Sequence, residues 1–163
     1  MSHDFTGVLL AIHVATEASA PMVELDAARL VEGLGIEGDR YATQRGTYSG
    51  RPLAGDNPFA NRQVTLIEME TLDALQRDHG IDLAPHETRR NLTTAGVPLN
   101  HLVGREFRVG DVVLVGGRLN VPCQYLEDLL GKPVFKPLIH RSGLNCRIVK
   151  GGTIRPGDAI RPL

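Results

Sequence analysis

Glycine and proline interrupt this chain so often that long regular elements are excluded over most of its length. The 163 residues include 18 glycines and 10 prolines, and these separate short stretches in which apolar and polar residues alternate. Such alternation is typical of strands with one buried face, and glycine and proline supply the tight turns between them. The pattern therefore predicts a barrel of many short strands, and it argues against a parallel sheet built from βαβ units.

Seven stretches have the alternation expected of strands. They are residues 8–14, 64–67, 107–109, 112–115, 119–121, 144–149 and 159–160. Helical spacing is clear only at residues 67–80, "IEMETLDALQRDHG", and residues 124–131, "QYLEDLLG", and each of these stretches ends at a glycine that can close a helix. Residues 26–34 fit a helix or a strand equally well. We expect a mainly β (α+β) fold with a few short helices.

The composition is that of an ordinary globular chain with an aliphatic core. Hydrophobic residues make up 42% and charged residues 23%, whereas aromatic residues make up only 4% and tryptophan is absent. A chain of this length buries about two-thirds of its unfolded surface in one core. We therefore expect a single domain over residues 1–163.

The charge balance argues against polyanionic partners. The 18 Lys and Arg residues against 19 Asp and Glu give a formal net charge of −1, so no global field attracts nucleic acid or an anionic membrane. The longest apolar run near the start, residues 8–12, is too short for a signal sequence or a membrane span. We expect a cytoplasmic protein that binds neither nucleic acid nor membranes, with Cys123 and Cys146 as free thiols.

Two neighbouring stretches are glycine-rich and irregular. Residues 41–63 have no sustained period and exceed the roughly 12 to 15 residues of an ordinary connection, so they form either a surface loop or a functional lid. Before them, "GLGIEG" at residues 33–38 has the glycine spacing of a dinucleotide-binding turn, but glycines and hydroxyl residues follow where that site needs a helix. We interpret it as a corner that carries Asp39 and Arg40 into the loop.

The two cysteines lie in different contexts. Cys146 alternates with Leu144 and Ile148, which indicates a small apolar residue on the inner side of a strand. Cys123 follows Pro122 where a strand gives way to a helix, and the free amides of a first helical turn lower the pKa of a thiol placed there. The six histidines have no partner at i, i+4 and no CxxC neighbour, so spacing does not predict a zinc site.

A second polar focus lies at residues 86–104. If the chain is extended from Arg89 to Leu92, Arg89 and Asn91 share one face and Arg90 points to the other. A guanidinium beside an amide suits a phosphate or the edge of a polar heterocycle. The alternative is an arginine that satisfies a loop carbonyl or a surface carboxylate.

Five stretches occur in an order typical of one known family. They are "GIEGDRY" (35–41), "NRQVTLIE" (61–68), "RRNLTTAGVPLNHLVGREFRVGDVVL" (89–114), "PCQYL" (122–126) and "GLNCRIVKGGTIRPGDAI" (143–160). Together they resemble the MOSC domain, the C-terminal domain of molybdenum cofactor sulfurases, and its stand-alone bacterial relatives. The resemblance covers nearly the whole chain, and it implies a strongly bent β barrel of the MOSC, pyruvate-kinase-barrel-like type.

The resemblance also implies site residues. The single functional cysteine of the family falls on Cys123, which would ligate molybdenum or carry a persulfide. The "RxN" motif of relatives that hold the molybdenum cofactor (molybdopterin) falls on Arg89 and Asn91. Further cofactor-binding candidates are Thr93, Arg40 and Arg62.

Three functions remain open at this point. In the first, the protein binds molybdenum through Cys123 and reduces N-hydroxylated compounds, as a molybdenum-dependent oxidoreductase. No flavin, nicotinamide or iron–sulfur motif is present, so an electron-transfer reductase would be its partner. In the second, a sulfurtransferase-like carrier takes a Cys123 persulfide from a cysteine desulfurase, with pyridoxal phosphate held only by that partner. In the third, the barrel binds another phosphorylated ligand.

Overall fold

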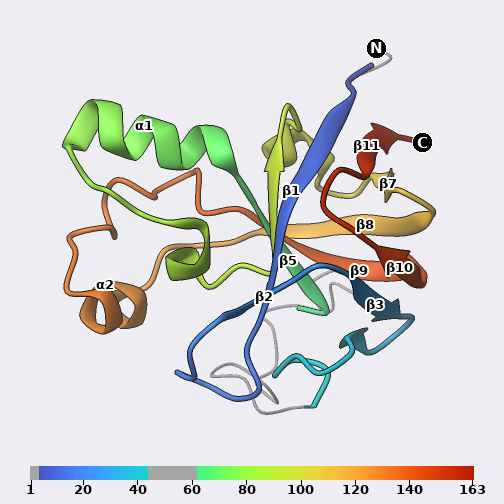
Figure 1. Cartoon of the computed structure of the whole chain (residues 1–163). Helices are drawn as coiled ribbons and strands as arrows, with labels where there is room; N and C mark the ends of the chain where they lie inside the picture. The colour runs from blue at the N-terminus through green and yellow to red at the C-terminus, as the bar shows by residue number, and fades with distance from the viewer. Residues whose placement is uncertain (1–3, 44–61) are drawn as a thin grey trace.

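The structure, a computed structural model, describes residues 4–43 and 62–163 (Figure 1). Its strands are β1 Gly7–Val14, β2 Val23–Leu25, β3 Ala28–Val31, β4 Gly35–Ile36, β5 Val64–Glu68, β6 Leu92–Ala95, β7 Glu106–Val109, β8 Val112–Leu119, β9 Leu144–Lys150, β10 Gly152–Ile154 and β11 Ala159–Pro162. The α-helices are α1 Met69–His79 and α2 Gln124–Leu130, and two short 3₁₀ turns are η2 Pro85–Thr88 and η3 Leu99–Leu102.

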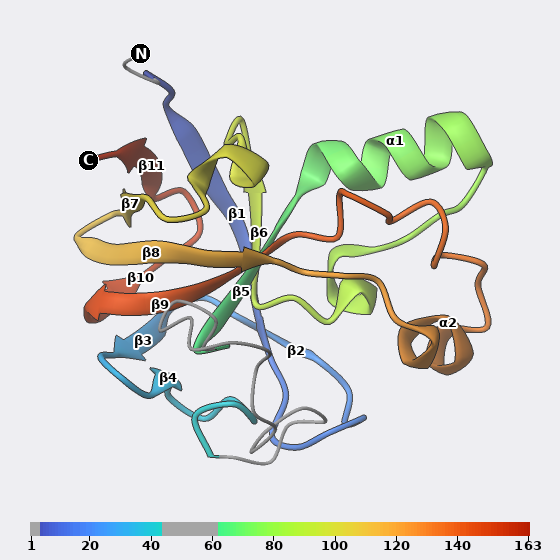
Figure 2. The same cartoon turned by 180° about the vertical axis from the view of Figure 1, so that it is seen from behind.

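Seven strands close into a mixed barrel in the order β11-β7-β8-β9-β5-β6-β1. Pairing of Gly7 with Ile160 and of Val8 with Ala159 joins the first strand to the last. Among the strands of the described ranges only β5 and β6 run parallel, because α1 connects them. Strand β2 pairs with the end of β1, along the edge whose beginning pairs with β11. Strands β10, β3 and β4 form a small second sheet below the barrel (Figure 2). The expected bent β barrel with few helices is confirmed.

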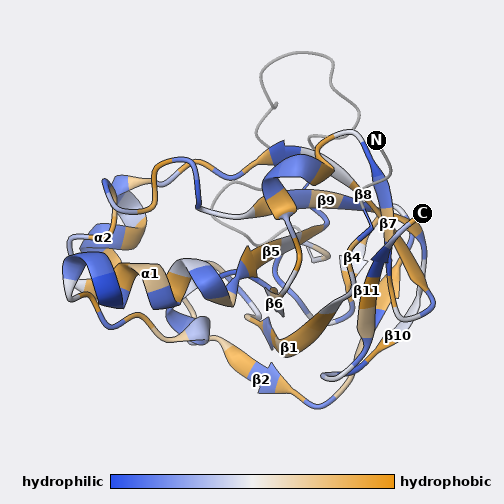
Figure 3. Ribbon diagram, turned by 90° about the horizontal axis from the view of Figure 1, so that it is seen from above, coloured by the Kyte–Doolittle hydropathy of each residue, from blue (hydrophilic) through white to orange (hydrophobic). Residues whose placement is uncertain are grey.

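Two apolar clusters lie on opposite faces of the barrel wall. Alternate residues such as Leu66 of β5 and Phe107 of β7 fill the barrel interior, and both are fully buried. The outward residue Ile67 instead packs against Leu75 of α1 and Leu126 of α2. The two helices therefore lie together on one side of the barrel (Figure 3), and their packing fixes the segment that carries Cys123.

The strand predictions agree with the structure in six stretches and fail in one. Residues 119–121 do not form a strand of their own, because β8 continues to Leu119 and the chain then leaves the sheet. The ambiguous stretch 26–34 contains β3. Strands β2, β4, β6 and β10 were not predicted, since they span only two to four residues and are too short for alternation to be recognised. Both helix ends are confirmed, because Gly80 and Gly131 close α1 and α2 at φ 64°.

The glycine-rich corner does not form a dinucleotide site. Gly35 and Ile36 form β4, and residues 37–43 continue as turns where a helix would be needed. Most of the stretch 41–63 lies outside the described residues, so the choice between loop and lid stays open. In the described ranges, no helix has the length and apolar character to cross a bilayer.

Candidate functional site

Cys123 caps the start of α2. Its backbone is extended, with φ −135° and ψ 151°, and helical geometry begins at Gln124. The side chain is half-buried against the cluster between the two helices, and it makes no capping hydrogen bond. The predicted position of Cys123 at a helix start is thus confirmed, but its thiol packs against the apolar cluster and forms no hydrogen bond to the first-turn amides. Cys146 is fully buried in the barrel interior, as its alternation predicted, and burial raises the pKa of its thiol well above the ordinary range.

The Arg90 guanidinium is fixed on Ser142. It donates from Nε to the Ser142 carbonyl at 3.0 Å and from Nη2 to Ser142 Oγ at 3.0 Å. Burial lowers the pKa of Arg90, while Tyr41 and Cys123 act in the opposite direction and the charges of Arg40 and Arg62 lower it further. The fixed guanidinium therefore lies within electrostatic range of Cys123 and of two further arginines.

Arg89 occupies a strained corner and has an unused donor. Its φ is 60°, because it closes the turn η2 in the left-handed conformation. Nη1 donates to the Ala20 carbonyl at 2.8 Å, whereas Nη2 is buried without a hydrogen-bond partner in residues 4–43 and 62–163. Burial lowers the pKa of Arg89, and the neighbouring charge of Arg40 lowers it further. Part of this guanidinium thus satisfies a loop carbonyl, and part is available to a ligand.

Arg40 joins the glycine-rich corner to Arg89. Its Nη1 lies 3.1 Å from Oδ1 of Asp39, which is fully buried, and its Nη2 donates to the Arg89 carbonyl at 3.0 Å. The guanidinium also stacks over the Tyr41 ring, 4.4 Å from its centroid. Asp39 in turn accepts hydrogen bonds from the main-chain amides of Ala15 and Tyr41. The pair therefore locks this corner against β1.

Asn91 ties strands together. It is fully buried, and its Oδ1 accepts both the amide and the hydroxyl of Thr65 at 3.1 Å. Its Nδ2 donates to the His13 carbonyl at 3.1 Å. Thr93 is also fully buried, and its hydroxyl has no hydrogen-bond partner in the part of the chain that the structure describes. The extended backbone assumed from Arg89 onward is wrong at Arg89 itself, so strand parity does not relate Arg89 to Asn91.

The structure brings four of the predicted residues together, and it adds others that the sequence did not single out. Arg40 bonds the Arg89 carbonyl, and the charges of Arg40, Arg62 and Cys123 all act on Arg90, which follows Arg89 in the chain. The added residues are Arg90, Tyr41, Ser142 and Tyr125, whose hydroxyl contacts Ser19 Oγ. Two features of the sequence could have indicated these residues: Tyr125 lies two positions after Cys123, and Arg90 directly follows Arg89. Ser142 has no sequence signal, because only folding brings it to Arg90.

The comparisons with known proteins agree with this architecture. The YuaD protein from Bacillus subtilis matches with a TM-score of 0.80 at 19% identity, over 99% of this chain and 97% of that chain. YiiM from Geobacillus stearothermophilus matches with a TM-score of 0.70 at 12% identity, over 96% and 75% of the two chains. YiiM from Escherichia coli matches with a TM-score of 0.66 at 16% identity, over 98% and 69%. The comparison with curated proteins found no match.

The sequence profile of the MOSC domain matches residues 40–161. The chain belongs to the MOSC domain family. The matched range begins at Arg40 and includes Arg62, Arg89 and Cys123, so the predicted site residues all lie inside the MOSC domain. The family is associated with the molybdenum cofactor.

The side chains of this MOSC domain fit such a cofactor. The described ranges contain no group of three or more His, Cys, Asp or Glu side chains able to hold a metal by themselves. A single soft thiol suits molybdenum whose other ligands come from the cofactor. The buried, unpartnered Nη2 of Arg89 offers a donor to an anionic group nearby. The thiol of Cys123 and the free donor of Arg89 are thus compatible in chemistry with a cofactor that carries a soft metal and a phosphate.

Proposed function

We propose that this MOSC protein binds the molybdenum cofactor, with Cys123 as the metal ligand and Arg89 as a phosphate anchor. The observation that carries the proposal is the buried Nη2 of Arg89, which has no hydrogen-bond partner in the described ranges and can donate to an anion. Cys123, half-buried at the start of α2, offers the soft sulfur ligand that molybdenum binds. Arg40 adds positive charge at Arg89, and Arg40 and Arg62 add it at Arg90.

Each arginine has a distinct task in this proposal. Arg89 uses Nη1 to fix itself on Ala20, so that Nη2 can meet a phosphate without a large entropic cost. Arg40 is committed to Asp39 and to the Arg89 carbonyl, so it orients Arg89 and adds charge. Asn91 fixes the backbone that follows the two arginines, through its bonds to Thr65. In the proposal Asn91 therefore acts on the cofactor indirectly.

The proposed reaction is the reduction of an N-hydroxylated compound. When bound, the molybdenum cofactor supplies two-electron exchange at oxygen, and the chain has no motif for a second redox cofactor. Electrons would come from a separate reductase that docks near the accessible side of Cys123. This chain's own part is to hold the cofactor, keep Arg90 charged and shield the metal with the α2 segment.

A sulfur-relay role is the second candidate. The observation that favours it is that the Cys123 thiol is half-exposed and makes no capping hydrogen bond, so that a persulfide could form and be handed on. The donor would be a pyridoxal-phosphate-dependent cysteine desulfurase. The positive charge of Arg90, which lies within electrostatic range of Cys123, would then favour the persulfide anion.

Metal analysis separates the two candidates. The full chain is purified from a host that makes the molybdenum cofactor, and molybdenum and cyanide-labile sulfur are measured for the wild type, Cys123→Ser and Cys146→Ala. Stoichiometric molybdenum that disappears only in Cys123→Ser supports ligation. Metal-free protein whose labile sulfur disappears in the same variant supports relay. Molybdenum retained at full load by Cys123→Ser would contradict the proposal.

A further inference from the structure

A row of polar side chains crosses the outer face of the barrel wall at one level. Cross-strand register places Arg118 of β8 opposite Asn145 of β9, and Asn145 opposite Thr65 of β5. Thr65 bonds the Asn91 side chain, and Asn91 bonds His13 of β1. Neighbouring residues on these strands, such as Leu144, face the barrel interior. The row therefore lies on the face away from the barrel core.

The two halves of this row differ in their hydrogen bonding. In one half, Asn91, Thr65 and the His13 carbonyl satisfy one another. In the other half, both amide atoms of Asn145 and the Arg118 Nε are buried and have no hydrogen-bond partner in the described ranges. The same is true of Nδ2 of Asn120, the residue that directly follows β8. The unpartnered atoms thus belong to three side chains at or just past the end of β8 and at the start of β9.

Asn145 is the centre of the cluster. Its exposed fraction is 0%, and more than about nine in ten buried polar groups in folded proteins are paired. The Thr65 hydroxyl is already engaged with Asn91 and does not hydrogen-bond the Asn145 side chain. It donates to Asn91 Oδ1 and accepts from the main-chain amide of Asn91. An amide that is unpartnered at both its donor and its acceptor lowers stability unless something else binds there. This observation points to a ligand group in contact with Asn145.

The surroundings specify the charge of that ligand. Arg118 and Asn120 are half-buried and reach the surface, whereas Asn145 is fully buried. Strands β8 and β9 contain no Asp or Glu, whereas Arg118 and Arg147 both lie on the outer face beside Asn145. The unpartnered atoms comprise donors from all three side chains and one acceptor, Asn145 Oδ1. An anion that also carries one proton matches this set.

We propose that Asn145, Arg118 and Asn120 form an anion-binding subsite for a protonated oxyanion group, of which hydrogen phosphate is the simplest example. The donors bind the anionic oxygens, and the Oδ1 of Asn145 accepts the proton of the ligand. The amide of Asn120 bonds the Gly143 carbonyl at 2.8 Å, so the chain after β8 is held against the residue that precedes β9. The subsite requires no metal, and Arg89 is not one of its residues.

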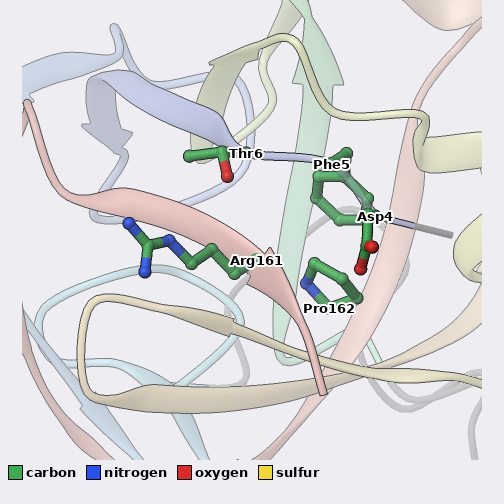
Figure 4. A pocket seen from close by; sticks show the side chains of 5 residues that line it. All are labelled: Asp4, Phe5, Thr6, Arg161 and Pro162. Carbon is green, nitrogen blue, oxygen red and sulfur yellow. The ribbon is translucent and has the colours of Figure 1, made fainter. Parts of the chain in front are cut away.

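A separate cavity near β11 has no unpartnered buried groups among the described residues. A cavity of about 340 Å³ lies between the N-terminal segment and β11, lined by Asp4, Phe5, Thr6, Arg161 and Pro162 (Figure 4). None of the buried unpartnered atoms of the described residues belongs to it. It therefore offers no donor set that needs a ligand.

The test uses the full chain from a host unable to make the molybdenum cofactor. Thermal unfolding is followed against inorganic phosphate, sulfate and chloride at equal ionic strength and neutral pH, since a ligand that binds only the folded state raises the melting temperature saturably. Phosphate should raise it more than sulfate does, because sulfate carries no proton for Asn145 Oδ1. Chloride should have no saturable effect.

Variants locate the effect. Asn145→Leu should abolish the phosphate response while leaving the melting temperature in chloride unchanged or higher, because an unpartnered amide is removed. Arg118→Gln and Asn120→Ala, at half-exposed positions, should weaken phosphate binding at least about three-fold and cover the case in which Asn145→Leu does not fold. Arg108→Gln removes the same charge from an exposed site on β7 and should leave the response intact.

Three results would overturn the proposal: no saturable phosphate response in the wild type, an unchanged response in Arg118→Gln and Asn120→Ala, or loss of the response in Arg89→Gln. The last result would place the anion in the other recess. Because no molybdenum is present, these results leave the proposed cofactor binding to be judged separately by metal analysis.

Discussion

Arg90 holds Ser142 with two nitrogens of its guanidinium, Nε on the main-chain oxygen and Nη2 on the hydroxyl, both at 3.0 Å. Ser142 lies two residues before the first residue of β9 and is 1% exposed. The contact therefore joins the corner after η2 to the start of a central barrel strand, residues far apart in the sequence. It also fixes a half-buried cation that lies within electrostatic range of Cys123.

Replacing Arg90 should lower the stability of the fold. Arg90→Gln removes two charge-assisted hydrogen bonds to Ser142, which we expect to lower the free energy of unfolding by about 1.5 to 3 kcal/mol. Urea unfolding measures this loss. Arg108→Gln serves as the exposed control, and equal behaviour of the two variants would show that the Ser142 contact has no energetic role.

The two cysteines should react at very different rates. Cys123 is half-buried at a helix start, whereas Cys146 is fully enclosed and burial raises the pKa of its thiol. A small alkylating agent should therefore modify Cys123 in the native state and reach Cys146 only when the barrel opens. Mass mapping after brief labelling checks this order. Modification of Cys146 first would mean that the assigned roles are reversed.

The Asp39 carboxylate should be essential for folding. It is fully buried and accepts hydrogen bonds from Arg40 and from the amides of Ala15 and Tyr41. Asp39→Asn leaves the Arg40 charge without its partner, and breaking a buried pair in this way costs about 3 to 5 kcal/mol. Glu37→Gln is the matched control, because its 4.0 Å pair with Arg29 is exposed and worth at most about 1 kcal/mol. Similar losses in the two variants would contradict this account.

Local patterns predicted most of the barrel, because its longer strands bury one face and show it in the sequence. Helix ends were predictable for a comparable reason, since Gly80 and Gly131 adopt a conformation that favours glycine. The shortest strands were missed, because pairing with neighbours, rather than their own residues, makes them strands. β4 is the clearest case, as its two residues are held by pairing with β3.

The site was predicted less completely than the fold. Cys123 could be found from its context, whereas the roles of Arg89 and Arg90 depended on an assumed extended backbone. The left-handed φ of 60° at Arg89 turns the chain there, and an arginine at this position does not by itself indicate such a turn. As a result Arg90, which was expected to point away from the site, is the arginine whose charge interacts with Cys123. Contacts between distant segments, such as Arg90 with Ser142, are set by the closed barrel.

Acid should destabilise the protein through His13. Burial lowers the pKa of His13 from 6.5, while Glu24 on the paired strand raises it and His86 lowers it. The unfolded chain therefore binds a proton at a higher pH than the folded chain does. The neutral ring contributes its full stability above about pH 6.5, and that contribution decreases as the pH falls through this value toward the folded-state pKa. Each unit of pKa lowering corresponds to about 1.4 kcal/mol.

Two variants change this pH dependence in opposite directions. His13→Gln has no proton to bind, so its free energy of unfolding should fall less than that of the wild type between pH 7.5 and 5.5. Glu24→Gln removes the charge that raises the pKa of His13, so its loss over the same range should be greater. Urea unfolding at a series of pH values measures all three proteins, and taking differences from the wild type cancels the contribution of Glu68, whose pKa burial raises. If all three curves are parallel, His13 does not control the acid response.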